Sequence, residues 1–291
     1  MEEDKLKTKK EIFNRISQKI NQSQLICKIT QQEISDSTKK TRQDGNTYSS
    51  NNFGTFEGKK IIMDILRDVD WELITAELER LVSLKHENLP RLYGATIDDC
   101  EIELIFECIS GKTLGDFSKD YFNEEAKVKI AKELCNAIEY LHTNNLIHKE
   151  LNLDKVMIEE NTNKVFLIDF GISKDCSKKT KKKGATYYLA PETFDDEEDD
   201  NGNIISKITH KVDVWSFGCI LSYLFSGYLP WTPKYKDSEP IIQKCLIKKS
   251  PFPVPDVIKN QSIKVIIEMA TNVDPYKRAT INEIKDLLDK L

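Results

Sequence analysis

The sequence predicts an α+β protein in which strands dominate the first part and helices the second. Two short apolar runs, at residues 61–66 and 102–109, have the length of buried strands. Residues 123–144 instead place their apolar side chains at helical spacing. At 291 residues, the chain is long enough for one two-lobed domain or two small ones.

The composition is that of an ordinary globular chain, with 39% hydrophobic and 31% charged residues. No run of about 18 apolar residues is present and the amino terminus resembles no secretion signal, so we expect no membrane span and a cytoplasmic location. The 7 cysteines form no Cys-x-x-Cys pair, which argues against a zinc site or a disulfide framework. The net charge of -5 argues against general nucleic-acid binding.

Residues 1–47 are expected to form an extension before the main domain. Apolar residues recur near helical spacing across residues 5–20, which predicts an amphipathic helix. This helix packs either on the rest of the chain or on a partner. Residues 31–52 are polar with almost no apolar residues, which predicts a loop or disordered linker.

The most informative stretch is residues 148–158, read together with Asp169-Phe170-Gly171. It begins His148-Lys149-Glu150-Leu151-Asn152-Leu153-Asp154-Lys155. This closely resembles the catalytic loop and metal-binding tripeptide of eukaryotic-type protein kinases, His-Arg-Asp-Leu-x-x-x-Asn and Asp-Phe-Gly. Further landmarks of this family follow in the right order at residues 184–192, 211–221 and 274–280. The resemblance covers about residues 48–291.

This resemblance implies a bilobal fold. A small antiparallel-sheet lobe with one regulatory helix is expected at about residues 48–109, and a larger, mainly helical lobe at about 110–291. Asp213 is expected to brace the catalytic loop, and Glu192 to pair with Arg278. The implied structural residues are His148, Phe170, Gly171, Glu192, Asp213 and Arg278.

Three catalytic-loop positions with a role in phosphoryl transfer depart from the family. Glu150 stands at the catalytic aspartate, Asn152 at a lysine that steadies the transferred phosphoryl group, and Lys155 at the asparagine that binds a second magnesium ion. Asp169, the first metal ligand, is retained. Because the Lys155 ammonium would lie close to Asp169, we expect an ion pair in place of the second metal.

The residues implied to bind the nucleotide phosphates are altered as well. In the frame of the Gly-x-Gly-x-x-Gly loop only Gly54 remains, because Ser49 and Asn51 replace the other two glycines. Asp64 stands at the phosphate-binding lysine, and Glu77 at that lysine's partner. Two carboxylates there would repel each other.

The base pocket shows two larger side chains, because Phe56 and Ile62 stand where a valine and an alanine are usual. They either fill the space of adenine or sit in a strand that relaxes to admit a nucleotide. A shifted alignment would place Lys59 or Lys60 at the lysine position. The other residues implied to line the nucleotide site are Phe106, Glu107, Cys108 and Met157.

Two functions follow from these observations. The first is a pseudokinase, which acts in signalling by binding a protein partner such as an active kinase or its substrate. The second is an active serine/threonine kinase with divergent geometry, for which ATP and magnesium are the implied cofactors. Ser177 and Thr180, near a lysine-rich run at 178–183, are candidate phosphorylation sites, and the acidic run 195–200 is expected to be an exposed insertion.

Overall fold

The computed structural model describes residues 27–28, 35–39, 52–56, 59–67, 81, 83–97, 101–118, 120–170, 185–194, 197–198, 204–205, 208–235 and 238–291. The described residues before Gly111 form one compact unit, and those from Gly111 onward form the other. The sequence places the boundary between its two expected lobes at about residue 110.

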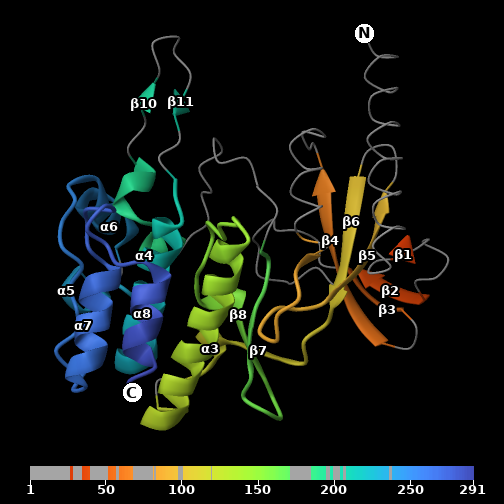
Figure 1. Cartoon of the computed structure of the whole chain (residues 1–291), viewed down its shortest axis with the longest axis horizontal. Helices are drawn as coiled ribbons and strands as arrows, with labels where there is room; N and C mark the ends of the chain where they lie inside the picture. The colour runs from red at the N-terminus through yellow and green to blue at the C-terminus, as the bar shows by residue number, and fades with distance from the viewer. Residues whose placement is uncertain are drawn as a thin grey trace. The chain divides into compact units, whose positions relative to one another are not determined.

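The described part of the first unit is a six-stranded sheet of order β1-β5-β6-β4-β3-β2 (Figure 1). All strand pairs are antiparallel except β1 with β5. The apolar runs of the sequence form its central strands, where Ile61, Leu104 and Ile105 are buried. The strands are β1 (Cys27–Lys28), β2 (Ser35–Lys39), β3 (Asn52–Phe56), β4 (Lys59–Arg67), β5 (Leu92–Ile97) and β6 (Glu101–Glu107).

The prediction of a structureless linker across residues 31–52 is wrong for Ser35–Lys39, which forms the edge strand β2. This strand pairs with β3, with Thr38 opposite Phe53. The polar sequence gave no strand signal. The pairing uses backbone groups, which any residue except proline supplies. The sheet therefore begins before residue 48. The helix expected at residues 5–20 lies outside the described residues.

The second unit is mainly helical, as predicted. Its short strands are β7 (Gly111–Thr113), β8 (Val156–Glu159) and β9 (Val165–Leu167), and a separate hairpin of β10 (Glu197–Glu198) and β11 (Ile204–Ile205). The α-helices are α3 (Glu124–Thr143), α4 (Lys211–Ser226), α5 (Thr232–Tyr235), α6 (Glu239–Ile247), α7 (Gln261–Ala270) and α8 (Ile281–Leu288). The 3₁₀ turns are η2 (Leu114–Asp116), η3 (Leu153–Lys155), η4 (Ala185–Tyr188) and η5 (Pro191–Phe194).

Local chemistry fixes the limits of the long helices. The Asn123 side chain caps α3 by accepting from the Ala126 amide at 2.8 Å. Thr280 and Glu283 form a reciprocal capping box at the start of α8. Gly227 ends α4 with a left-handed φ of 73°, which costs glycine little. The apolar spacing in residues 123–144 therefore marks a real helix, α3, whose ends are set by polar residues.

Helix α4 is the centre of the second unit and is buried from Val212 to Ser222. It packs against α3 and α7. The approach to α7 is close at Gly218, where an added Cβ would lie 2.7 Å from the Thr271 methyl group and 2.8 Å from the Ala270 Cβ. A glycine at this position permits the two helices to touch.

Replacing Gly218 by alanine should therefore lower the free energy of unfolding. Overpacking costs about 1–3 kcal/mol, and the better helix propensity of alanine offsets up to about 1 kcal/mol of that. Urea unfolding measures the difference. Gly115→Ala is the matched control, because its nearest new contact would be an ordinary 3.4 Å. Equal stability of the two variants would contradict the close approach of α4 and α7.

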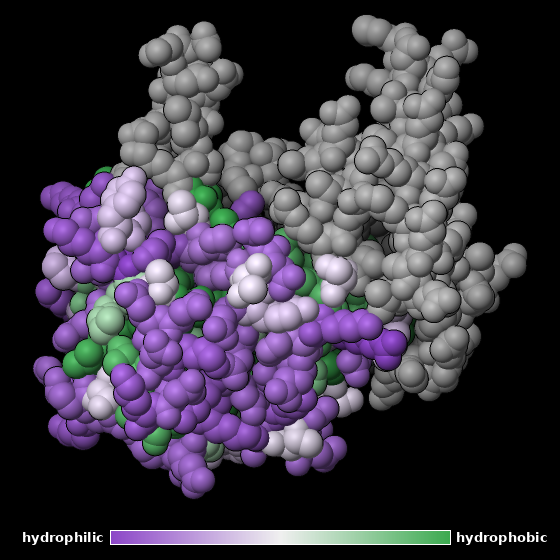
Figure 2. All heavy atoms as spheres, viewed as in Figure 1, coloured by the Kyte–Doolittle hydropathy of each residue, from purple (hydrophilic) through white to green (hydrophobic). Residues whose placement is uncertain are grey.

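Hydrophilic residues dominate the described surface seen in Figure 2, with hydrophobic residues scattered among them. Within the described ranges, no helix is long and apolar enough to cross a bilayer.

Candidate functional site

The catalytic loop lies between the end of α3 and the start of β8. The Asp213 carboxylate of α4 accepts hydrogen bonds from its backbone. One Asp213 oxygen accepts the His148 amide at 2.8 Å and the other accepts the Lys149 amide at 2.8 Å. The His142 ring lies 2.9 Å from the same carboxylate. Lys149 has a left-handed φ of 67°, a conformation that needs such support in a residue with a Cβ. The loop is therefore fixed by one buried carboxylate.

Asp213 remains charged although it is only 1% exposed. Burial by itself would raise the pKa of Asp213. The hydrogen bond and charge of His142, with the donors of His148, outweigh burial and hold that pKa below its ordinary value. Sequence reasoning did not find His142, although it is one of only 4 histidines and lies six residues before the loop histidine.

His148 links the loop to the residue before Asp169. Its ring Nε2 lies 3.0 Å from the Ile168 carbonyl, which can only accept, so Nε2 carries the proton. Burial lowers the pKa of His148, and this outweighs the opposing effect of the Asp213 charge. A neutral ring with its proton on Nε2 satisfies both observations.

Acid should therefore destabilise the second unit through His148. The unfolded residue gains a proton near pH 6.5, while the folded residue resists it to a lower pH. Below about pH 6.5 the unfolded chain binds more protons, so the free energy of unfolding falls by up to about 1.4 kcal/mol per pH unit for this histidine. Denaturation between pH 5 and 7 should show a shallower slope for His148→Gln than for the wild type. Identical slopes in the two proteins would contradict the assignment.

The amide of Asn152 is engaged with the loop's own backbone. It donates to the Glu150 carbonyl at 2.9 Å and accepts from the Asp154 amide at 2.9 Å, which caps η3. The neighbouring Glu150 amide donates to the His148 carbonyl at 2.8 Å. The side chain at position 152 therefore forms hydrogen bonds within the loop, whereas kinases usually have a cationic side chain there.

Lys155 and Asp169 form an ion pair, as the sequence led us to expect. The register of the β8–β9 hairpin causes the meeting, because Val156 lies opposite Leu167 and the Ile168 amide donates to the Lys155 carbonyl at 2.9 Å. The two side chains are 12% and 26% exposed, so water screens their attraction only in part. Asp169 has a left-handed φ of 58°, and its carboxylate accepts from the Lys155 ammonium.

This arrangement does not fit a second magnesium ion. Magnesium takes oxygen ligands in near-octahedral geometry, and position 155 supplies an ammonium group instead of an amide oxygen. The same ammonium occupies one Asp169 oxygen. A divalent cation at Asp169 would have to displace the lysine or lie beside its positive charge. Among the residues that the structure describes, no three His, Cys, Asp or Glu side chains are grouped to hold a metal.

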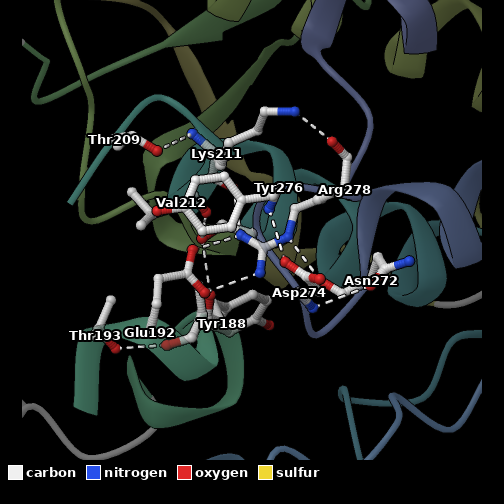
Figure 3. A network of polar contacts seen from close by, with 12 residues as sticks. Tyr188, Glu192, Thr193, Thr209, Lys211, Val212, Asn272, Asp274, Tyr276 and Arg278 are labelled. Carbon is white, nitrogen blue, oxygen red and sulfur yellow. Dashed lines mark hydrogen bonds and ion pairs between the residues drawn. The ribbon is translucent and has the colours of Figure 1, made fainter. Parts of the chain in front are cut away.

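The Arg278 guanidinium is the centre of a network of polar contacts in the second unit (Figure 3). It forms two hydrogen bonds with Glu192, at 2.6 and 2.8 Å, and both residues are buried. It also donates to the backbone carbonyls of Lys211 and Asn272 and lies 5.0 Å from the Trp215 ring. The network joins η5, the start of α4 and the loop before α8. These contacts are structural.

The residues implied to bind nucleotide fall into both units. Gly54 and Phe56 lie in β3, Ile62 and Asp64 in β4, Phe106 and Glu107 in β6, Cys108 directly after it, and Met157 in β8. Asp64 is opposite Leu104 in mid-strand, whereas Lys59 and Lys60 open β4 opposite Phe56 and Thr55. β4 thus begins before the apolar run. The remaining implied residues, Ser49, Asn51, Glu77, Gly171, Ser177 and Thr180, lie outside the described residues.

A small, mostly antiparallel sheet unit, a mainly helical unit and a loop braced from a buried helix define a kinase-like protein. The protein kinase domain model matches residues 45–287, and the chain belongs to this family.

Among its relatives is Probable serine/threonine-protein kinase MARK-B of Dictyostelium discoideum, 30% identical over 220 residues, which are 73% of this chain and 29% of that protein. Calcium-dependent protein kinase 4 of Plasmodium berghei is 30% identical over 203 residues, 67% of this chain and 36% of that protein. 3-phosphoinositide-dependent protein kinase B of Dictyostelium discoideum is 28% identical over 232 residues, 76% of this chain and 24% of that protein. This chain therefore matches about a third or less of each relative's length.

Proposed function

We propose that this chain is a pseudokinase that acts in signalling by binding a protein partner, such as an active kinase or its substrate. The carrying observation is the Lys155–Asp169 ion pair. It places a fixed positive charge on the carboxylate that the family uses for magnesium. Phosphoryl transfer depends on positioning and on metal-assisted charge neutralisation. Because the Lys155 ammonium occupies the Asp169 carboxylate, the site has lost part of its metal-assisted charge neutralisation and part of its ability to position the phosphates.

Two further substitutions support the proposal. Glu150 has one more methylene than the family's aspartate, and a displacement of about an ångström can cost on the order of a hundredfold in rate. The Asn152 amide is bound to the loop backbone. It supplies no charge to a phosphoryl group.

An active serine/threonine kinase is the second candidate. Two observations favour it: carboxylates are retained at positions 150 and 169, and the relatives are protein kinases by name, one of them a serine/threonine-protein kinase. In that case the chain would transfer the γ-phosphoryl group of ATP with divergent geometry. Radioactive ATP in a transfer assay separates the two functions, and activity that disappears in Asp169→Ala would support the kinase.

The Lys155→Asn variant gives a test that does not depend on turnover. With ATP present, the wild-type melting temperature should not respond to a magnesium titration, because Lys155 blocks the cation. The variant should gain a magnesium-dependent rise, since a ligand at a hundred times its Kd stabilises the native state by about 2.7 kcal/mol. Lys164→Asn is a matched control on the same hairpin and should behave as the wild type. Tight magnesium-dependent ATP binding by the wild type would refute the proposal.

A further inference from the structure

Three of the chain's 4 histidines gather around the buried Asp213 carboxylate. The His148 amide and the His142 ring meet the same Asp213 oxygen, at 2.8 and 2.9 Å. The His210 ring lies against the His142 ring, with 4.6 Å between the ring centroids and 43° between the ring planes. The carboxylate that holds the catalytic loop is therefore flanked by two imidazole rings in contact.

This arrangement disfavours a charged His210. The residue is half-buried, and its Nε2 atom is buried without a hydrogen-bond partner among the described residues. An imidazolium ring carries a hydrogen on both nitrogens, so charging His210 would bury an unpaired N–H group and place a positive ring beside His142. Both costs disappear when the His210 side chain turns out to water.

His142 cannot relieve this conflict by releasing the proton that faces Asp213. The charged carboxylate can only accept, so the His142 Nε2 carries a hydrogen. A further proton on Nδ1 makes the His142 ring a cation, which the Asp213 charge attracts and a charged His210 repels. Burial, followed by the His142 charge, lowers the pKa of His210 below its ordinary value, and the two outweigh the opposing charge of Asp213.

The groups that act on His210 by charge are His142 from α3 and Asp213 from α4. Only Asp213 favours a proton on His210, and its oxygens are already shared by the His142 ring and two loop amides. The neighbouring Lys211 directs its ammonium to the Arg278 carbonyl. The other charged or titratable groups on the elements around the pair are Glu139 of α3, His148 and Lys149 of the loop, and Glu283 of α8.

From this geometry we propose that His142 and His210 form a pH-sensitive latch on the catalytic loop: a proton taken up by His210 drives the two rings apart and opens the Asp213 carboxylate to water. Histidine pairs suit such a role because their charge changes close to neutral pH. The inference goes beyond the proposed function, because it concerns the backbone of the loop and applies to a pseudokinase and to an active kinase alike.

Acid should open the latch. In the open state His210 faces water and binds a proton near pH 6.5, whereas in the closed state it binds one only at lower pH. Below about pH 6.5 the open state therefore holds more protons, and its population rises by up to about tenfold per pH unit. Above that pH neither state charges His210, and the latch stays closed.

Hydrogen exchange of the full-length chain, followed by NMR between pH 5 and 7, measures the opening at the His148 and Lys149 amides. After correction for intrinsic exchange, their protection should fall roughly tenfold from pH 6.5 to pH 5 in the wild type. The amides of Ile266 and Ile267 in α7 are the internal reference and should keep their protection. The histidine ring signals of the same sample should show His210 titrating with a midpoint below 6.5.

Two substitutions at position 210 separate the charge from the ring. His210→Phe retains an aromatic ring that cannot charge, so the fall in protection should shrink to about threefold or less, the remainder arising from His148. His210→Lys carries a permanent charge and should lower the protection of both amides already at pH 7. The His210 side chain makes no capping bond to α4, so neither change removes a helix cap.

The contact between the rings has its own test. In His142→Gln, which retains a donor for Asp213 but no charge, the His210 midpoint should move upward because the repulsion is gone. An unchanged midpoint would overturn the proposal, as would equal pH dependence in the wild type and His210→Phe. Equal loss of protection at Ile266 and Ile267 would also overturn it, because acid would then unfold the whole unit instead of opening the loop.

Discussion

Replacing Arg278 by alanine should lower the free energy of unfolding by about 3–5 kcal/mol, the cost of removing one partner of a buried ion pair. Glu192 would be left as a carboxylate only 5% exposed without its two guanidinium hydrogen bonds. The Lys211 and Asn272 carbonyls would lose a donor at the same time. Chemical denaturation followed by tryptophan fluorescence measures the loss, because Trp215 lies under the guanidinium.

The neighbouring residue provides the control. The Lys277 side chain is 77% exposed and lies 3.8 Å from Asp274, so Lys277→Ala should change stability by no more than about 0.5 kcal/mol. The double variant Glu192→Leu/Arg278→Met should be more stable than either single variant, since an apolar pair leaves no unpaired buried charge. A loss below about 1 kcal/mol in Arg278→Ala would mean that the network contributes little.

Asp213→Ala should have the second largest effect, a loss of about 3 kcal/mol or more. It would leave the His148 and Lys149 amides without their acceptor, and each unsatisfied buried group costs about 1–3 kcal/mol. His142 would lose the same carboxylate. Because Lys149 holds a left-handed backbone conformation, the loop should relax when the brace is removed.

Hydrogen exchange locates this effect, since the two loop amides should lose protection even under conditions where the helices remain folded. Asp213→Asn should lie between the wild type and alanine, because it retains one acceptor but loses the charge. Asp289→Ala, whose side chain is 56% exposed and 3.8 Å from Lys285, should remain near wild-type stability. Unchanged protection of both amides in Asp213→Ala would show that the loop has another support.

Much of the site was readable from local sequence. The spacing of His148, Glu150 and Lys155 followed by Asp169 pointed to the catalytic loop, and the charge at position 155 was enough to anticipate its ion pair. The His142 ring beside Asp213 carries no local signal and was missed. His142 and Asp213 are 71 residues apart, and nothing near either residue in the sequence points to the other.

Strand β2 is an element of secondary structure that the sequence pattern did not predict. Its residues, Ser35-Asp-Ser-Thr-Lys39, have neither apolar alternation nor β-branched enrichment, so pattern and propensity both favoured a linker. Pairing with β3 made it a strand, because a sheet edge offers backbone partners regardless of side-chain type.

The sequence by itself determined the protein kinase family and the substitutions at positions 150, 152 and 155, because motif spacing and residue chemistry are local properties. Only the tertiary structure decided which side chains meet: the hairpin register that joins Lys155 to Asp169, and the histidine beside Asp213. Those contacts depend on how distant segments pack, and packing is a property of the whole fold.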